Sequence, residues 1–252
     1  MKNLQFIIVI CSIAFGVSVS STVEASVQVG DRIRFTNRVG STAGGEFGVH
    51  RKDNANPFSP GGESAELFRT FCLERNEFID FNAVDPSGFI IDSISKEAVN
   101  GGVGGPNPDP ISSGTAWLFY NFTIGTLDDL IAGYSYNDTA SANALQEAIW
   151  FAEEELTVLP AGLATTLYNT ASAANATVAL ARTFVLNIVW AADRGTAFDG
   201  VYEGPSPGSM TDGDPAQSML YVVPEASTVA VWSILSLMGV IAAYQNRAKS
   251  AN

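Results

Sequence analysis

Short stretches in which apolar residues alternate with polar ones, or are β-branched and aromatic, recur along the chain, and both patterns are typical of β-strands. Between them, the segments 37–60 and 99–113 are rich in Gly, Ser, Asn or Pro, which indicates turns and loops. We therefore predict strands over 27–29, 32–35, 67–81, 89–91, 117–123, 184–189 and 219–223, of which 67–81 would be a strand pair with a turn near Arg75.

The middle of the chain has a helical period instead. Apolar residues at helical spacing predict an amphipathic helix over 142–156, capped by Thr139 or Ser141, and the Ala- and Leu-rich segment 163–181 predicts a second helix. The apolar stripe of the first helix consists of Leu145, Ala148, Ile149, Ala152 and Leu156. Because strands precede and follow these helices, we predict an α+β fold, an antiparallel and barrel-like β-sheet with an inserted helical pair.

The stripe also predicts how the polar residues of the first helix are placed. Gln146 lies about 100° from Leu145 around the helix axis, so we expect it to be half-buried at the border of the stripe. Trp150 follows one turn later on the same side. Glu147 and Glu154 are expected to face solvent, and the run 153–155 is expected to be a solvated helix end.

Both ends of the chain depart from the domain pattern. Lys2 precedes an apolar run over 6–19, and small residues at Val23 and Ala25 suit signal peptidase, so we predict a cleaved signal peptide over 1–25 and an exported domain over 26–223. The end segment 224–252 contains a second apolar run over 229–244, followed by basic Arg247. This run predicts a hydrophobic helix that holds the terminus in a membrane with its charges on the cytoplasmic side. At about 16 residues it is short for a permanent span, which suits a transient signal.

The C-terminal segment resembles the PEP-CTERM sorting signal, in which a Pro-Glu-Pro motif precedes a hydrophobic helix and a basic end. Pro224, Glu225 and Ser227 match that motif, while Ala226 replaces its second proline, and Arg247 belongs to a thin basic end. The resemblance implies processing near the Pro-Glu pair by an exosortase, a membrane protease-transpeptidase. It therefore implies a protein of the bacterial cell envelope, cell surface or extracellular matrix that is anchored in the membrane only transiently.

Composition narrows the function of the exported domain. The formal net charge of the chain is −13, and such an acidic surface repels phosphate backbones, so no nucleic-acid partner is expected. The spaced Asp and Asn ligands of an EF-hand loop are absent, and we expect neither a metal site nor a cofactor. Cys11 falls within the predicted signal peptide, which leaves Cys72 as the only cysteine of the mature chain. A single cysteine in an exported protein is either buried and inert, paired with another molecule, or used chemically.

Two segments resemble the two halves of the thioester-domain motif of bacterial surface adhesins. Phe71 precedes Cys72 on a predicted strand, and Gln146 is followed at the third and fourth positions by Ile149 and Trp150 on a predicted helix. The resemblance implies an internal thioester between Cys72 and Gln146, an activated acyl group that the lysine amine of a partner converts into a permanent amide. Such a protein is not a turnover enzyme, because the product consumes the reactive group.

Three functions remain open from the sequence. The first is a surface adhesin that captures a lysine-bearing surface or matrix partner through Cys72 and Gln146, and the second is a non-covalent matrix or envelope protein of the same fold. The third is a secreted hydrolase. The only histidine, His50, has no nucleophile-elbow serine to serve, and a cysteine protease of Cys72 and His50 lacks a recognisable third residue. Carboxylate pairs for a glycosidase are numerous, but their spacing selects none of them.

Overall fold

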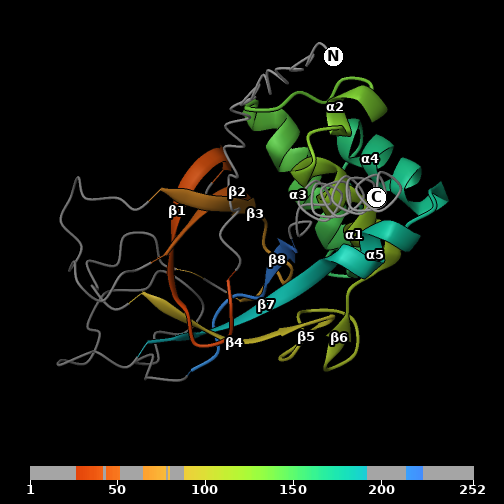
Figure 1. Ribbon diagram of the computed structural model, residues 1–252. Helices are drawn as coiled ribbons and strands as arrows, with labels where there is room; N and C mark the ends of the chain where they lie inside the picture. Colours follow the sequence, from red (N-terminus) through yellow and green to blue (C-terminus); the bar gives the residue numbers. More distant parts are fainter. Residues whose placement is uncertain are drawn as a thin grey trace, which may run out of the picture.

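The computed structural model describes residues 27–41, 44–51, 65–77, 79, 88–191 and 214–223. Within these segments an antiparallel sheet lies beside a group of helices, which confirms the predicted α+β class (Figure 1). The main sheet has the strand order β3–β2–β1–β4–β7–β8. Its strands are β1 (Arg32–Ser41), β2 (Gly44–Arg51), β3 (Glu66–Thr70), β4 (Phe89–Ser95), β7 (Thr183–Trp190) and β8 (Met219–Val222).

The two edge strands of this order meet, so the sheet curls into a nearly closed barrel. The chain that follows β3 pairs with β8, because Cys72 forms an antiparallel bridge with Met219. Beside it the Leu220 N–H donates to the Phe71 carbonyl over 3.2 Å, and the Thr70 hydroxyl donates to the Leu220 carbonyl over 2.7 Å. Cys72 therefore lies in the seam that closes the barrel.

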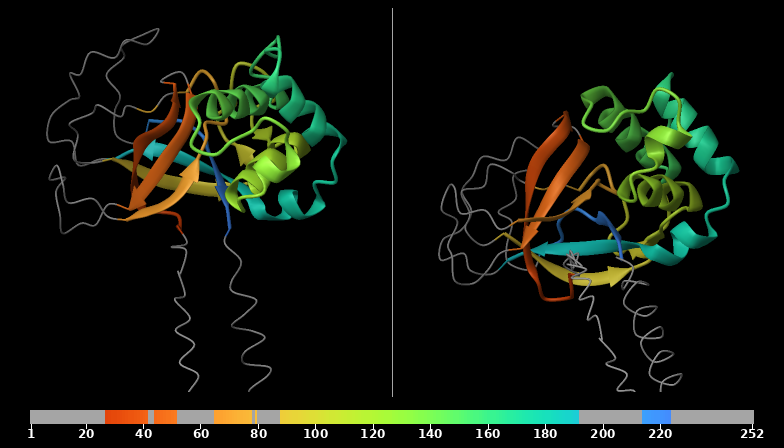
Figure 2. Two further views of the ribbon diagram at one scale, coloured as in Figure 1. Left: turned by 90° about the horizontal axis from the view of Figure 1, so that it is seen from above. Right: turned by 45° about the horizontal axis from the view of Figure 1, so that its top comes forward.

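The helices form one insertion between β4 and β7 and gather on one side of the sheet (Figure 2). The insertion begins with the short pair β5 (Glu97–Ala98) and β6 (Asp109–Pro110). Where the sequence predicts two helices, the described chain contains five: α1 (Ser113–Thr123), α2 (Leu127–Leu130), α3 (Thr139–Ala152), α4 (Leu163–Ala173) and α5 (Thr177–Arg182).

The predicted helix over 142–156 corresponds to α3, with shifted ends. Its N-cap is Asp138 rather than Thr139 or Ser141, and the Asp138 carboxylate accepts the Ser141 N–H over 2.8 Å. The predicted helix over 163–181 is interrupted at Ala174, whose extended backbone separates α4 from α5. Asn175 follows this residue, and its side-chain oxygen accepts the Thr177 N–H over 3.0 Å at the start of α5.

The hydrophobic core consists of two clusters that meet at α3 and at the end of β3. The helical cluster contains Phe71, Leu145 and Ile149, and the barrel cluster contains Cys72 and Trp150. Successive residues of an extended chain point to opposite sides, which places Phe71 and Cys72 in different clusters. In the same way α3 turns Leu145 to the helices and Trp150 to the barrel.

The prediction of a strand over 117–123 is wrong, because this segment lies in α1. The Ser112 hydroxyl caps the helix by accepting the Thr115 N–H over 3.1 Å. Leu118, Phe119 and Phe122 are buried in the helical cluster, and the Phe122 ring lies 5.0 Å from the Phe71 ring, edge to face. Aromatic residues favour strands only weakly, and packing against neighbouring elements overrides that preference.

The prediction of turns and loops over 37–60 is also wrong for much of its length, because β1 continues to Ser41 and β2 occupies 44–51. Glycine makes this hairpin end feasible, since Gly40 and Gly45 face each other with φ of +126° and +131°, values that side chains disfavour. Charged residues that suggested a loop pair across the strands instead, as described below.

Three further expectations concern the ends and the segment after β3. A single strand, β3, and the isolated bridge at Cys72 replace the strand pair predicted over 67–81, as far as that segment is described. The predicted signal peptide over 1–25 and the sorting tail over 224–252 lie outside the described residues. In the part of the chain that the structure describes, no helix has the length and apolarity needed to cross a membrane.

Candidate functional site

Cys72 and Gln146, which lie 74 residues apart in sequence, contact each other directly. The Gln146 Oε1 atom accepts the Cys72 backbone N–H over 3.1 Å, and Gln146 Nε2 donates to the Cys72 carbonyl over 2.8 Å. The same Oε1 atom also accepts the Gly45 N–H over 3.4 Å. The carboxamide therefore acts as a further peptide group in the barrel seam, and it is held against the residue that carries the thiol.

This contact is closed to solvent. Gln146 is 1% exposed and Cys72 is 6% exposed, so the expectation of a half-buried Gln146 is wrong. The side of α3 that points away from the helical cluster faces the barrel seam rather than solvent, which explains the difference. Trp150 packs in the same cluster as Cys72, and its indole Nε1 has no hydrogen-bond acceptor among the described residues. The supporting residues Phe71 and Ile149 are fully buried on the helical side.

Burial also changes the acidity of the thiol. Removal from water raises the pKa of Cys72 far above its ordinary value, and the charge of Glu77 raises it further. The sulfur is therefore a neutral thiol at neutral pH, and it is a free cysteine. A buried, protonated thiol is a poor target for external reagents, so any reaction of Cys72 is directed to groups already inside the site.

The end of the β1–β2 hairpin covers Gln146. Gly40 lies so close to Gly45 that a Cβ on Gly40 would sit 2.9 Å from the Gly45 Cα and 3.3 Å from the Asn143 side-chain oxygen. Asn143 precedes Gln146 by three residues on α3. The hairpin thus rests on α3 directly over the glutamine, and an amine from a partner must pass this cover.

Replacing Gly45 by alanine is expected to destabilise this cover by about 1–3 kcal/mol. The new Cβ would lie 3.0 Å from the Gly40 Cα and 3.2 Å from the Val39 carbonyl oxygen, on a backbone with φ of +131°. Urea unfolding of the variant measures the loss. Gly133→Ala, whose position is also at positive φ but has open space around its Cβ, is the control for the backbone effect alone. If both variants lose the same free energy of unfolding, the close approach of Gly40 and Gly45 over Gln146 does not contribute to stability.

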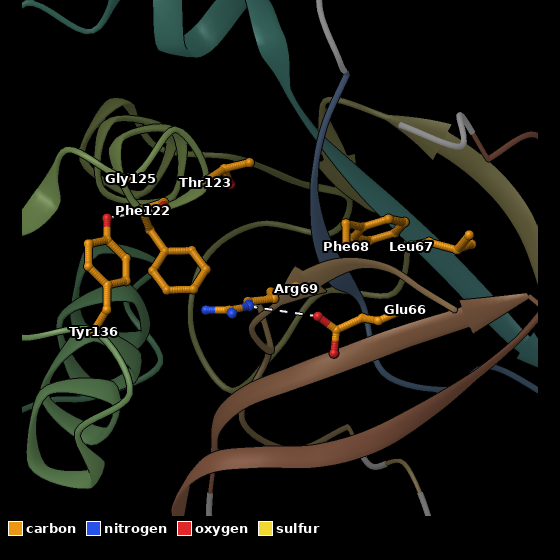
Figure 3. Close-up of a pocket in the computed structure, with 8 residues that line it drawn as sticks. All are labelled: Glu66, Leu67, Phe68, Arg69, Phe122, Thr123, Gly125 and Tyr136. Carbon is orange, nitrogen blue, oxygen red and sulfur yellow. Dashed lines mark hydrogen bonds and ion pairs between the residues drawn. The ribbon is translucent and has the colours of Figure 1, made fainter. Parts of the chain in front are cut away.

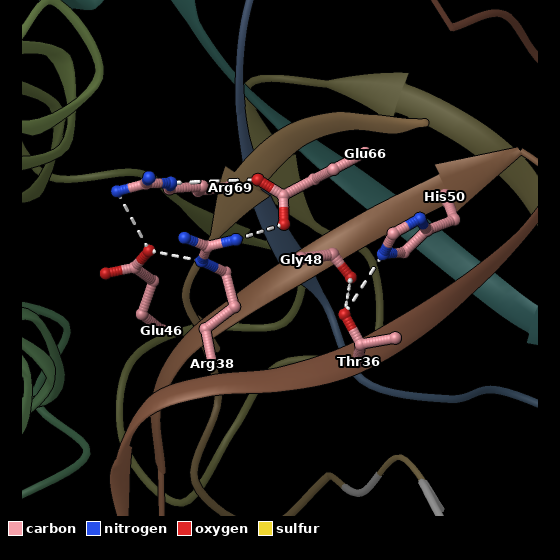
Figure 4. A network of polar contacts seen from close by, with 7 residues as sticks. All are labelled: Thr36, Arg38, Glu46, Gly48, His50, Glu66 and Arg69. Carbon is pink, nitrogen blue, oxygen red and sulfur yellow. Dashed lines mark hydrogen bonds and ion pairs between the residues drawn. The ribbon is translucent and has the colours of Figure 1, made fainter. Parts of the chain in front are cut away.

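An ion-pair network holds β1, β2 and β3 together beside the site (Figure 4). Arg38 donates to Glu46 over 2.9 Å and to Glu66 over 2.6 Å, and Arg69 reaches Glu46 over 3.2 Å. Glu46 is only 3% exposed and follows Gly45, the residue whose N–H contacts Gln146. The network therefore fixes the position of the strand that covers the glutamine.

The structure does not bring His50 to Cys72. His50 pairs in register with Glu66 at the start of β3, whereas Cys72 follows the other end of that strand. Four residues of β3 alone span about 13 Å at 3.3 Å per residue. The His50 Nε2 atom lies 3.0 Å from the Thr36 hydroxyl instead (Figure 4). The arrangement needed for a Cys–His nucleophile is absent from this pair.

A recess of about 340 Å³ opens next to the strand that leads to Cys72 (Figure 3). One wall is β3 from Glu66 to Arg69, and the other contains Phe122 and Tyr136. The Phe122 ring contacts the Phe71 ring at 5.0 Å, and Phe71 precedes Cys72. The recess combines aromatic walls with an Arg–Glu pair, so it suits a mixed polar and apolar side chain.

The sequence failed to reveal a group of buried carboxyls on the far side of Cys72. The prediction that 153–155 is a solvated helix end is wrong, because Glu153 is 3% exposed and Glu155 is 2% exposed, while Glu154 between them is exposed as expected. Glu74 is also completely buried. Burial raises the pKa of Glu74 to about 9 and that of Glu153 to about 7. The run of three glutamates gave no signal of burial, since only the tertiary fold turns two of them inward.

The remaining predicted site residues are those of the sorting motif. Pro224, Glu225, Ala226, Ser227 and Arg247 lie outside the described residues. Within the described segments, no group of three or more His, Cys, Asp or Glu side chains is arranged to hold a metal ion.

Comparison of the chain with protein-family models, with curated proteins and with solved structures gives no match in any of the three.

Proposed function

We propose that this protein is an exported, adhesin-like surface protein that attaches to a lysine amine of its partner through an internal thioester between Cys72 and Gln146. The observation that carries the proposal is a pair of hydrogen bonds, which join the Gln146 carboxamide to the backbone N–H and to the backbone carbonyl of Cys72. A carboxamide held against the residue that carries the thiol, in a site closed to water, supports formation of a thioester. Holding reactants together in this way is worth effective concentrations of up to about 10⁵–10⁸ M.

Thioester formation is a balanced exchange between the two side chains. The Cys72 sulfur attacks the Gln146 carboxamide carbon, a C–S bond forms and the C–N bond breaks. The thiol proton leaves with the amide nitrogen, which departs as ammonia. Burial of Gln146 and Cys72 protects the product from hydrolysis, because water reaches neither side chain readily.

Capture then uses the stored acyl group once. The lysine Nζ of a partner attacks the acyl carbon of Gln146, a C–N bond forms and the C–S bond breaks. The proton lost from the amine goes to the sulfur, which restores the Cys72 thiol. The product is a permanent amide between the two proteins.

Charge and location support a partner on the cell surface or in its matrix. The net charge of −13 favours a partner surface that is basic and therefore rich in lysine. The signal-peptide pattern over 1–25 and the PEP-CTERM-like tail support export, processing by an exosortase-type protease and temporary anchoring in the membrane. The recess beside Phe122 offers room for a partner side chain close to the reactive lysine.

The intact mass of the purified protein tests the proposal. The wild type is expected to be lighter than its sequence by one ammonia, and methylamine is expected to add its own mass to this lighter form. Cys72→Ala is expected to show neither effect. A wild type of full sequence mass overturns the covalent function. Thiol labelling alone does not decide, because a buried thiol of raised pKa reacts poorly whether or not the thioester forms.

One observation favours a second candidate, a non-covalent matrix or envelope protein of the same fold. The Gln146 carboxamide satisfies three backbone groups, the N–H and carbonyl of Cys72 and the N–H of Gly45, which is a complete structural role by itself. In this candidate the glutamine closes the barrel seam and no bond forms. A wild type of full sequence mass, together with a large loss of stability on replacing Gln146, would identify this non-covalent candidate.

A further inference from the structure

Glu74 is a buried carboxyl group without a donor. It is 0% exposed, and neither of its oxygens has a hydrogen-bond partner among the described residues. An ionised carboxylate in such a place is very unfavourable, because it has lost its water and gained no donor. The group must therefore be neutralised by something at this position.

The carboxyl group of Glu155 faces Glu74, and both of its oxygens accept hydrogen bonds from backbone N–H groups. Glu155 Oε2 accepts the N–H groups of Arg75 over 2.8 Å and of Val103 over 3.0 Å, while Oε1 accepts the Gly104 N–H over 2.9 Å. Three N–H donors stabilise a carboxylate ion. Glu155 is thus suited to be the ionised member of the pair.

The two carboxyls meet under a glycine loop. A Cβ added to Gly102 would collide with Oε2 of Glu74 and with Oε1 of Glu155 at once, so both oxygens lie against the same point of the backbone. Only glycine permits the loop to approach this closely. The loop, the segment after Cys72 and the chain that follows α3 therefore converge on one pair of carboxyl groups.

We propose that Glu74 and Glu155 share one proton at neutral pH and form a pH-sensitive latch that holds the loop 101–105 against both sides of the Cys72–Gln146 site. Glu74 carries the proton and donates it to the Glu155 carboxylate. Loss of the proton to water at alkaline pH leaves two buried charges side by side, and the loop is released. Glu74 follows Cys72 by two residues and Glu155 follows the helix of Gln146, so the latch ties the two halves of the site together.

A proton fits this place better than a cation does. The donors around Glu155 point positive N–H groups at the oxygens that a metal ion would need. No metal-binding group of three or more side chains is found in the described segments. A strong hydrogen bond between a carboxylic acid and a carboxylate needs only the two groups present.

The charged neighbours act in the same direction. Glu155, Glu77 and Asp109 all raise the pKa of Glu74, after burial itself, to about 9. The pKa of Asp109 is raised to about 6, first by burial and then by Glu155 and Glu154, and burial also raises the pKa of Glu77. Glu153 lies beyond Asp109, with its pKa at about 7. Every one of these neighbours is acidic, so each favours keeping the proton.

Hydrogen exchange at the amides of Arg75, Val103 and Gly104 tests the latch, because Glu155 accepts all three. After correction for the intrinsic exchange rate, their protection is expected to fall about tenfold for each pH unit between neutral pH and the pKa of Glu74 at about 9, and to level off above it. Glu74→Gln keeps a neutral donor next to Glu155, so its protection is expected to stay constant. Gly102→Ala is expected to show low protection already at neutral pH. Glu147→Gln, a change on α3 outside the carboxyl group, is the matched control and is expected to behave like the wild type.

Infrared spectroscopy supplies a second readout for the case that Glu74→Gln does not fold. The wild type is expected to show a protonated carboxylic acid band at about pH 8, above the pKa of Glu153 and below that of Glu74, and this band is expected to disappear at higher pH. Absence of that band, equal pH profiles in wild type and Glu74→Gln, or a profile that changes with Ca²⁺ and reverts with a chelator would each overturn the latch. These readouts do not depend on thioester formation, so the latch is tested independently of the proposed function.

Discussion

In the protein without a thioester, replacing Gln146 by alanine is expected to lower the free energy of unfolding by about 3–4 kcal/mol. The change leaves the N–H and carbonyl of Cys72 and the N–H of Gly45 buried without partners. Each such group costs about 1–3 kcal/mol, and the seam that closes the barrel loses its link to α3. Urea unfolding, compared with that of the wild type, measures the effect.

Two variants give this prediction its controls. Glu147→Ala changes the neighbouring residue of α3, which is only partly buried, and is expected to alter stability by no more than about 0.5 kcal/mol. Cys72→Ala removes only the side chain and keeps both backbone groups bonded to Gln146, so without a thioester it is expected to cost about 1 kcal/mol. A Gln146→Ala variant as stable as Glu147→Ala would mean that Gln146 does not hold the seam.

Stability is expected to fall by about 3 kcal/mol between pH 7 and pH 9. The pKa of Glu74 rises from 4.5 to about 9 on folding, so the folded state binds this proton more tightly than the unfolded state does. The stabilising contribution is complete below pH 4.5, declines by about 1.4 kcal/mol per pH unit and is lost at about pH 9. Glu153 and Asp109 have pKa values of about 7 and about 6, so their titration also lowers stability as the pH rises. Most of that loss has occurred by about pH 7.

The difference between two proteins isolates the Glu74 contribution. Urea unfolding of wild type and of Glu74→Gln at a series of pH values is expected to give a falling curve and a flat curve between pH 7 and pH 9. Below pH 7 both curves are expected to fall with rising pH, because Glu153 and Asp109 titrate in both proteins. Parallel curves above pH 7 would assign the loss of stability to other groups.

Several elements were predictable because their signal is local. Alternating or β-branched residues predicted β4, β7 and β8 near their observed positions, and the apolar stripe predicted α3. The order of these elements predicted the α+β class and the barrel-like antiparallel sheet. In each case the residues that pack together lie on one face of one element, so their spacing is visible in the sequence.

Other elements were predicted wrongly because distant residues decide them. The aromatic segment 117–123 is helical since Phe119 and Phe122 pack on Phe71. The polar segment after Asn37 is a hairpin because Arg38 and Arg69 pair with Glu46 across three strands. The partners of these side chains are far away in the sequence, and local propensity carries no information about them.

By itself, the sequence determined the fold class, the position of the main helix and the two residues worth testing as a reactive pair, Cys72 and Gln146. Only the tertiary structure decided that the Gln146 carboxamide bonds to the backbone of Cys72, and that Glu74 and Glu155 are buried face to face. The physical reason is the same in both cases. Periodicity reports which side of an element is apolar, whereas a hydrogen bond or a shared proton depends on which distant group the folded chain places opposite.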